Sequence, residues 1–333
     1  MKSDPNLYDY WPYAGRPKIV WPGGKKLAFW IAPNIEFYEY MPPGNPKRNP
    51  WPNAIPNVQQ YSQRDFGNRV GHIRLMELLD KYNLRGSVSL NVALCDHHPE
   101  IIEDCVKRDW EFFSHGIYNT RYSYGLTPEQ EQAVLDDSIK TVEKATGQRI
   151  RGYLAPALTH TEDTLDLIAE NQFWYSCDLF QDDQPQPIKT KTGKLVSMPY
   201  SLEVNDVITY SVMGMDPDRY TDVLKRHFDQ LLLEGERSGT VMCIPLHAYL
   251  VSQPNRIRVF EEALKHICAH QDDVWYATGK EIAKHFIDNY WDSSLEDIRK
   301  RGVATGGTGF NPIRGNHGEI LSQISQTPIW PGS

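Results

Sequence analysis

The sequence contains no hydrophobic run long enough to cross a membrane. Its longest largely uncharged apolar stretch, residues 240–251, provides about half of the ~20 residues that a membrane-spanning helix needs. Residues 1–15 are polar, contain proline and lack the apolar centre of a secretory signal peptide. We therefore expect a soluble protein, located in the cytoplasm.

Cysteine is scarce, and positive charge is not concentrated in any segment. The five cysteines are scattered and form no Cys-X-X-Cys pair, so neither a zinc ribbon nor a redox motif is expected. Lys and Arg total 35 against 43 Asp and Glu, which gives a formal net charge of −8. Because a net-negative surface repels phosphate groups, nucleic acid and anionic membranes are not expected partners.

The composition is otherwise that of an ordinary globular protein with a large core. Of 333 residues, 40% are hydrophobic and 23% are charged. This length fits either two domains or one α/β barrel. Residues 41–56 contain six prolines, and proline neither continues a helix nor donates to a β-ladder. This stretch is predicted to be a long irregular loop, either at the rim of a site or in an oligomer contact.

Strand-like and helix-like segments alternate along most of the chain. Strands are predicted at residues 27–31, 87–92, 110–113, 150–154, 173–177, 195–198, 207–212, 240–246 and 274–277. Helices are predicted at residues 68–83, 99–107, 127–147, 159–171, 216–234 and 256–270, with a final one from residue 278. Capping boxes mark three helix starts, at Thr127, Thr159 and Thr278. The alternation favours a (β/α) barrel, with a doubly wound open sheet as the second choice.

The chain is predicted to have three regions. Residues 1–60 form an N-terminal arm and Pro-rich loop packed on the barrel, and residues 20–290 form the barrel. Residues 291–333 have no strong periodicity and are expected to form an irregular extension that wraps the barrel or a neighbouring subunit.

Polar side chains follow several predicted strands, at the edge where barrel active sites lie. The acids and imidazoles among them include Glu36, His115, Asp183 and His247. Their convergence indicates a hydrolytic site. Each also has a structural alternative, because a histidine after a strand is often a core residue and Asp183 could cap a turn before Pro185. His266 and His270 have metal-compatible spacing, but their helix is expected on the outside of the barrel.

Five segments in order carry a family resemblance: YSQRDFGNRVG at residues 61–71, EFFSHGIYN at 111–119, GYLAP at 152–156, IPLH at 244–247 with QPNR at 253–256, and VWYATGKEI at 274–282. With them the chain resembles the polysaccharide deacetylase superfamily, which has the NodB homology fold of carbohydrate esterase family four. Within it, the chain is most similar to an allantoinase-like or cyclic-imidase-like branch.

The resemblance implies a deformed (β/α)7 barrel that hydrolyses a C–N amide bond. In metal-dependent members an Asp-His-His triad holds a divalent ion, a carboxylate deprotonates water and a late histidine protonates the leaving nitrogen. The first metal histidine matches His115 and the late one matches His247. Two departures stand out, because the second metal histidine is Asn119 and the first-strand Asp pair reads Asn34-Ile35-Glu36. An asparagine is no base, and it is a poorer zinc ligand than imidazole.

These matches give a set of candidate residues. The catalytic candidates are Glu36, His115 and His247, and Glu36, His115 and Asn119 would hold a divalent metal, with zinc preferred. Without a metal, Glu36 would activate water, and a histidine would donate to the developing oxyanion. The residues expected to contact substrate are Asn34, Tyr118, Pro156 and Asp183.

Three functions compete at this point. The first is hydrolysis of a small cyclic imide, ureide or related amide, which a signal-free acidic chain favours. The second is deacetylation of N-acetylated sugars, which needs an open groove and usually the full metal triad. The third is a non-catalytic binding protein, which the retention of both His115 and His247 argues against. By analogy with the same family, a homo-oligomer is expected.

Overall fold

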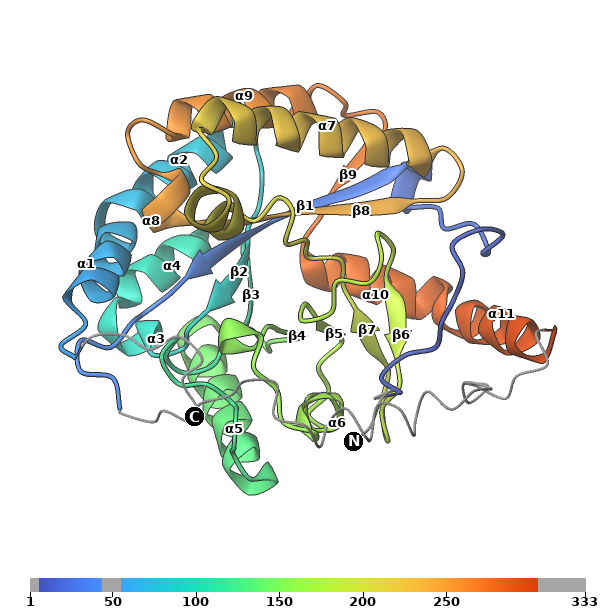
Figure 1. Ribbon diagram of the computed structural model, residues 1–333, viewed down its shortest axis with the longest axis horizontal. Coiled ribbons are helices and arrows are strands. Elements are labelled where there is room, and N and C mark those ends of the chain that lie inside the picture. Colours follow the sequence, from blue (N-terminus) through green and yellow to red (C-terminus); the bar gives the residue numbers. More distant parts are fainter. Residues whose placement is uncertain (1–5, 44–54, 305–333) are drawn as a thin grey trace, which may run out of the picture.

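The computed structural model describes residues 6–43 and 55–304, and it builds them around one curled, mostly parallel sheet. Figure 1 shows the strands fanning around the middle of the molecule, with helices α1, α2, α7 and α9 along the outside. The strand order is β6-β7-β5-β4-β3-β2-β1-β8, and β9 also pairs with β1. Among the named strands of the described residues, only β6 and β7 pair in antiparallel fashion. The predicted deformed (β/α) barrel is confirmed.

The strands are short except for the neighbouring pair β1 and β8. They are β1 (Leu27–Ile35), β2 (Ser87–Leu90), β3 (Glu111–Ser114), β4 (Gly152–Tyr153), β5 (Tyr175–Ser176), β6 (Gln186–Ile188), β7 (Leu195–Ser197), β8 (Thr240–His247) and β9 (Val274–Tyr276). Every residue of β1 and β8 is buried, as expected for parallel strands covered on both faces. Their register pairs Asn34 with His247, so the polar ends of both strands meet.

The helices lie between the strands, as the alternation predicts. They are α1 (Val58–Phe66), α2 (His72–Lys81), α3 (Leu94–His97), α4 (Pro99–Lys107), α5 (Pro128–Thr146), α6 (Thr164–Glu170), α7 (Pro217–Gly235), α8 (Ala248–Val251), α9 (Ile257–Cys268), α10 (Gly279–Asn289) and α11 (Trp291–Ala304). The capping box at Thr127 is confirmed, since Gln130 and Thr127 bond each other's backbone N–H groups.

Two glycines bring α8 against the junction between α1 and α2. A π-helical turn at Gly67–Gly71 makes α1 and α2 continuous, so the helix predicted from residue 68 begins at Val58. A Cβ at Gly71 would overlap the carbonyl of Ala248, and one at Gly67 would crowd the backbone of Tyr249. Only glycine therefore permits this approach, which places α1 next to the end of β8.

Three local predictions are wrong. Residues 207–212 form a π-helical turn rather than a strand, because Asn205 accepts from the Val207 N–H and from the Thr209 hydroxyl. Helix α6 begins at Thr164, and the Thr159 hydroxyl bonds loop backbone instead of capping it. The C-terminal extension begins with helix α11 rather than irregular chain.

Other predictions lie outside the described residues or stay open. Most of the Pro-rich loop (residues 44–54) and the chain after residue 304 lie outside them. Within the described ranges, no helix is long and apolar enough to span a bilayer, and the five cysteines are unpaired. The three-region division, the cytoplasmic location and the homo-oligomer stay predictions.

Candidate active site

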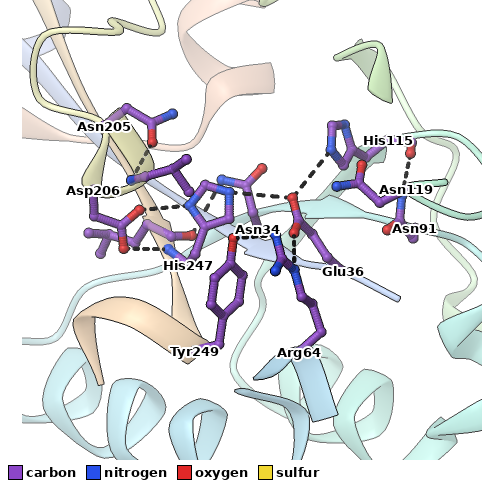
Figure 2. Close-up of polar contacts among 12 residues, drawn as sticks. Asn34, Glu36, Arg64, Asn91, His115, Asn119, Asn205, Asp206, His247 and Tyr249 are labelled. Atoms are coloured by element: carbon purple, nitrogen blue, oxygen red, sulfur yellow. Dashed lines mark hydrogen bonds and ion pairs between the residues drawn. The ribbon is translucent and has the colours of Figure 1, made fainter. Parts of the chain in front are cut away.

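A cavity of about 420 Å3 lies at the carboxyl end of the sheet. The last residues of β1 and β8, and those just after β3 and β4, form its floor. Its polar side chains are Asn34, Glu36, Gln60, Arg64, His115, Asn119, Asn205 and His247. The remaining wall is aliphatic and aromatic, from Tyr38, Tyr122, Leu154, Ala155, Ala157, Leu158, Tyr200, Leu202, Val207, Ile208, Val212 and Tyr249. Figure 2 shows the polar group at its centre.

His247, the last residue of β8, is held by a fully buried aspartate. Its Nδ1 lies 2.7 Å from Asp206 Oδ1, and its backbone N–H donates to Asp206 Oδ2 at 2.8 Å. Its Nε2 lies 3.4 Å from Glu36 Oε1. Burial opposes the charged ring, but Asp206 and Glu36 raise the pKa of His247 to about 9. The ring is therefore a protonated acid at neutral pH, with its Nε2–H directed at Glu36.

Glu36 follows β1 directly and faces three positive or hydrogen-bonding groups. Its Oε1 lies 3.7 Å from His115 Nε2, and its Oε2 lies 3.4 Å from Arg64 Nε. Burial by itself raises the pKa of this carboxyl, but His247, His115 and Arg64 together hold the pKa well below its ordinary value. Glu36 is thus an ionised carboxylate in a buried position, able to accept a proton from water.

His115, one residue after β3, is oriented by backbone on a neighbouring strand. Its Nδ1 lies 3.0 Å from the carbonyl oxygen of Leu154, just after β4. Because a carbonyl only accepts, Nδ1 carries the hydrogen and the Nε2 edge faces Glu36. The Asn91 amide also donates to the His115 carbonyl, which ties this loop to the end of β2.

Arg64 is a site residue that the sequence reasoning missed. Its guanidinium lies 3.9 Å from the ring centre of Tyr38 and 4.1 Å from that of Tyr249, a cation–π arrangement. It also donates to the Tyr249 hydroxyl at 2.9 Å. It lies in the quoted YSQRDFGNRVG segment, but an arginine among polar neighbours looks like a solvated helix face. Asp206 was missed as well, because it precedes a segment predicted as a strand.

Of the four residues predicted to contact substrate, two lie at or beside the cavity. Asn34 lines the cavity. Its side-chain amide, however, already bonds to the protein, because it donates to the Tyr200 hydroxyl at 2.8 Å and to the Leu246 carbonyl. Pro156 lies between two lining residues, Ala155 and Ala157.

Two further predicted contacts lie elsewhere, which corrects their expected position. Tyr118 is turned outward, with its hydroxyl 3.2 Å from His97 Nε2 and its ring against Phe37. Asp183 lines a separate cavity of about 320 Å3 that it shares with His227. The reason is that the Asp183 carbonyl accepts from the Val241 N–H at 2.9 Å, near the start of β8 and at the opposite end of that strand from His247.

The residues proposed as metal ligands do not fit a divalent ion well. Glu36 and Asp206 are already balanced by Arg64 and protonated His247, so an added ion would leave two uncompensated buried positive charges. Among the described residues, no three His, Cys, Asp or Glu side chains are arranged to hold a metal. Asn119 supplies only a neutral amide oxygen.

The fold is a deformed α/β barrel, and a buried carboxylate and two histidines meet at the carboxyl end of its sheet. Residues 65–175 match the family model described as polysaccharide deacetylase. Residues 65–175, from the end of α1 to β5, thus carry the similarity to polysaccharide deacetylases, which are hydrolases of carbon–nitrogen bonds other than peptide bonds. The predicted family and enzyme class are confirmed.

Three relatives illustrate the similarity. A peptidoglycan deacetylase of Helicobacter pylori is 23% identical over 253 residues, which cover 67% of this chain and 85% of the relative. Two solved structures have a TM-score of 0.74 at 24% identity and cover 83% of this chain. One is described as Puue allantoinase, with 95% of that chain covered. The other is a probable polysaccharide deacetylase of Pseudomonas aeruginosa, with 96% covered. At these identities the two structures support the barrel fold.

Proposed function

We propose that the protein hydrolyses a ring amide of a small molecule, such as a cyclic imide or ureide. The observation that carries this proposal is the buried chain from Glu36 through His247 to Asp206, at the floor of a cavity of about 420 Å3. Cavities of a few hundred Å3 with mainly apolar walls and a few convergent polar groups are typical of small-molecule sites. A polymer would need contacts that extend beyond this cavity.

The geometry supports a two-residue proton transfer. Glu36 accepts a proton from water, whose oxygen then attacks the amide carbonyl carbon. His247 donates its Nε2 proton to the leaving nitrogen as the C–N bond breaks, which gives a carboxylic acid and an amine or amide. Asp206 holds the His247 ring in the donating tautomer. Arg64 supplies fixed positive charge in the cavity where the oxyanion develops.

Deacetylation of an N-acetyl amide is the second candidate. It is favoured by the name of the Helicobacter pylori relative, which matches this chain over 85% of its own length. The same acid and base would serve that reaction, since both reactions break a C–N amide bond. The two candidates therefore differ in substrate and not in the residues that act.

A substrate panel separates the candidates. We expect base-titrated hydrolysis of allantoin, hydantoin or succinimide, with no acetate released from N-acetylglucosamine oligomers. After prolonged chelation the rate is expected to stay unchanged, and added zinc should not raise it, because the site charges already balance. Acetate release from the sugars alone would favour the second candidate. A rate that depends on zinc would show that the charge argument against a metal is wrong.

The pH dependence is a direct consequence of the His247 environment. Its folded-state pKa of about 9 lies above the ordinary imidazole value of 6.5, so the acid stays protonated through neutral pH and is lost as pH rises through about 9. The basic form of Glu36 persists to well below 4.5. We expect kcat/KM to be flat from pH 6 to 8 and to fall above about 9. A fall centred near 6.5, with the fold intact by circular dichroism, would contradict this assignment.

A further inference from the structure

Asn119 has a buried hydrogen-bond acceptor that no described residue satisfies. Its side-chain oxygen is among the buried polar atoms without a partner. The residue itself is only 5% exposed. A buried acceptor without a partner loses its hydrogen bond to water and gains none in return, so such atoms are rare unless a ligand or water bonds to them.

The position of this amide is well defined. The backbone N–H of Asn119 donates to the Phe37 carbonyl at 3.1 Å, and its side-chain nitrogen donates to the Tyr38 hydroxyl at 2.8 Å. Tyr38 takes one of the two amide hydrogens, which leaves the second as a donor. Asn119 lines the same cavity as Glu36 and His115, and Figure 2 shows it on the His115 side of Glu36. Asn119 therefore brings an unpartnered acceptor and a second amide hydrogen to the wall of the cavity that contains the proposed base.

We infer that Asn119 is a specificity-determining residue that selects amides whose N–H and C=O point to the same side. This inference rests on the proposed function and deepens it, because it names the substrate class. A ring holds a secondary amide in the cis form, so its N–H and C=O form one edge. The Asn119 oxygen accepts from that N–H while its amide hydrogen donates to that C=O.

An open-chain N-acetyl group cannot use this pair. Its amide is trans, with N–H and C=O on opposite sides, and the cis form of an open-chain secondary amide is strongly disfavoured. Such a ligand satisfies either the acceptor or the donor of Asn119, but not both.

The test is a binding measurement that needs no turnover. Three neutral probes are titrated into the full chain by ligand-observed NMR: δ-valerolactam, its N-methyl derivative and N-methylacetamide. We expect δ-valerolactam to bind about tenfold more tightly than either of the others, as expected when a buried hydrogen bond is gained or lost. Asn119→Leu should remove this preference, and Asn289→Leu, a matched change on the exposed side of α10, should keep it.

The outcomes separate this inference from the proposed function. Equal affinities for the three probes in the unaltered protein, or a lactam preference that survives Asn119→Leu, would overturn the role of Asn119. A lactam preference with no hydrolysis of any ring amide would support the role of Asn119 and refute the proposed reaction. The comparison of lactam and N-methyl lactam uses only the unaltered protein, so it remains decisive if Asn119→Leu does not fold.

Discussion

Glu36→Gln is expected to lower kcat/KM by about 10³-fold, the middle of the range for a proton-transfer group. Glutamine preserves the size of the side chain, but its amide cannot accept a proton from water. Glu36 is also the carboxylate that faces Arg64, His115 and His247, so no other described group is placed to replace it as the base. Steady-state hydrolysis of the best ring amide in the panel measures the effect.

Two controls make this result interpretable. Glu100→Gln removes an exposed carboxylate on α4 and should leave the rate unchanged. Thermal unfolding of Glu36→Gln is measured in parallel, because the change leaves Arg64 and His247 with one carboxylate fewer and is expected to reduce stability. A folded Glu36→Gln protein with near-normal activity would exclude Glu36 as the base.

His247→Ala is expected to lower turnover at least ~100-fold while the protein remains folded. The His247 imidazole carries the proton that faces Glu36. Without this ring, no proton donor among the described residues is placed beside the leaving nitrogen. The substitution also leaves the buried Asp206 carboxylate without its imidazole partner, although the residue 247 backbone N–H still donates to it. The loss should appear mainly in kcat, because proton donation matters in the transition state.

The structure offers a matched control for this variant. His266 forms a second His–Asp pair, with Nε2 2.7 Å from Asp229, but both side chains are partly exposed on α9 and α7. His266→Ala should therefore leave activity unchanged. Asp206→Asn tests the same assignment in another way, because it should move the alkaline fall in kcat/KM from about 9 toward 6.5. A full rate in His247→Ala would remove this histidine from the mechanism.

The sequence predicted the residues of the site better than their interactions. Glu36, His115 and His247 follow three separate strands, and parallel strands bring their carboxyl ends to one edge, so their convergence needed only the strand order. Arg64 comes from a helix, and nothing in its neighbours distinguishes it from a solvated arginine. Asp206 lies in a segment whose apolar pattern resembles a strand, and only side-chain bonds to the backbone make that segment a π-helical turn.

The prediction of a metal site likewise had the right position but lacked the interactions around it. The motif spacing placed Asn119 where a metal ligand was expected, but it contained no information about the charges packed around it. The approach of α8 to Gly67 and Gly71 brings Tyr249 and Arg64 together, and Arg64 then provides a positive charge beside Glu36.

The alternating hydrophobic pattern, the capping residues and the five ordered motifs by themselves determined the barrel, the family and the three groups at its edge. These features are local, because each depends on a few neighbouring residues. The tertiary structure decided the protonation of His247, the charge balance around Glu36 and the unpartnered oxygen of Asn119. Those properties depend on burial and on contacts between residues far apart in the chain, since the pKa of a buried group is set by the charges that the fold places against it.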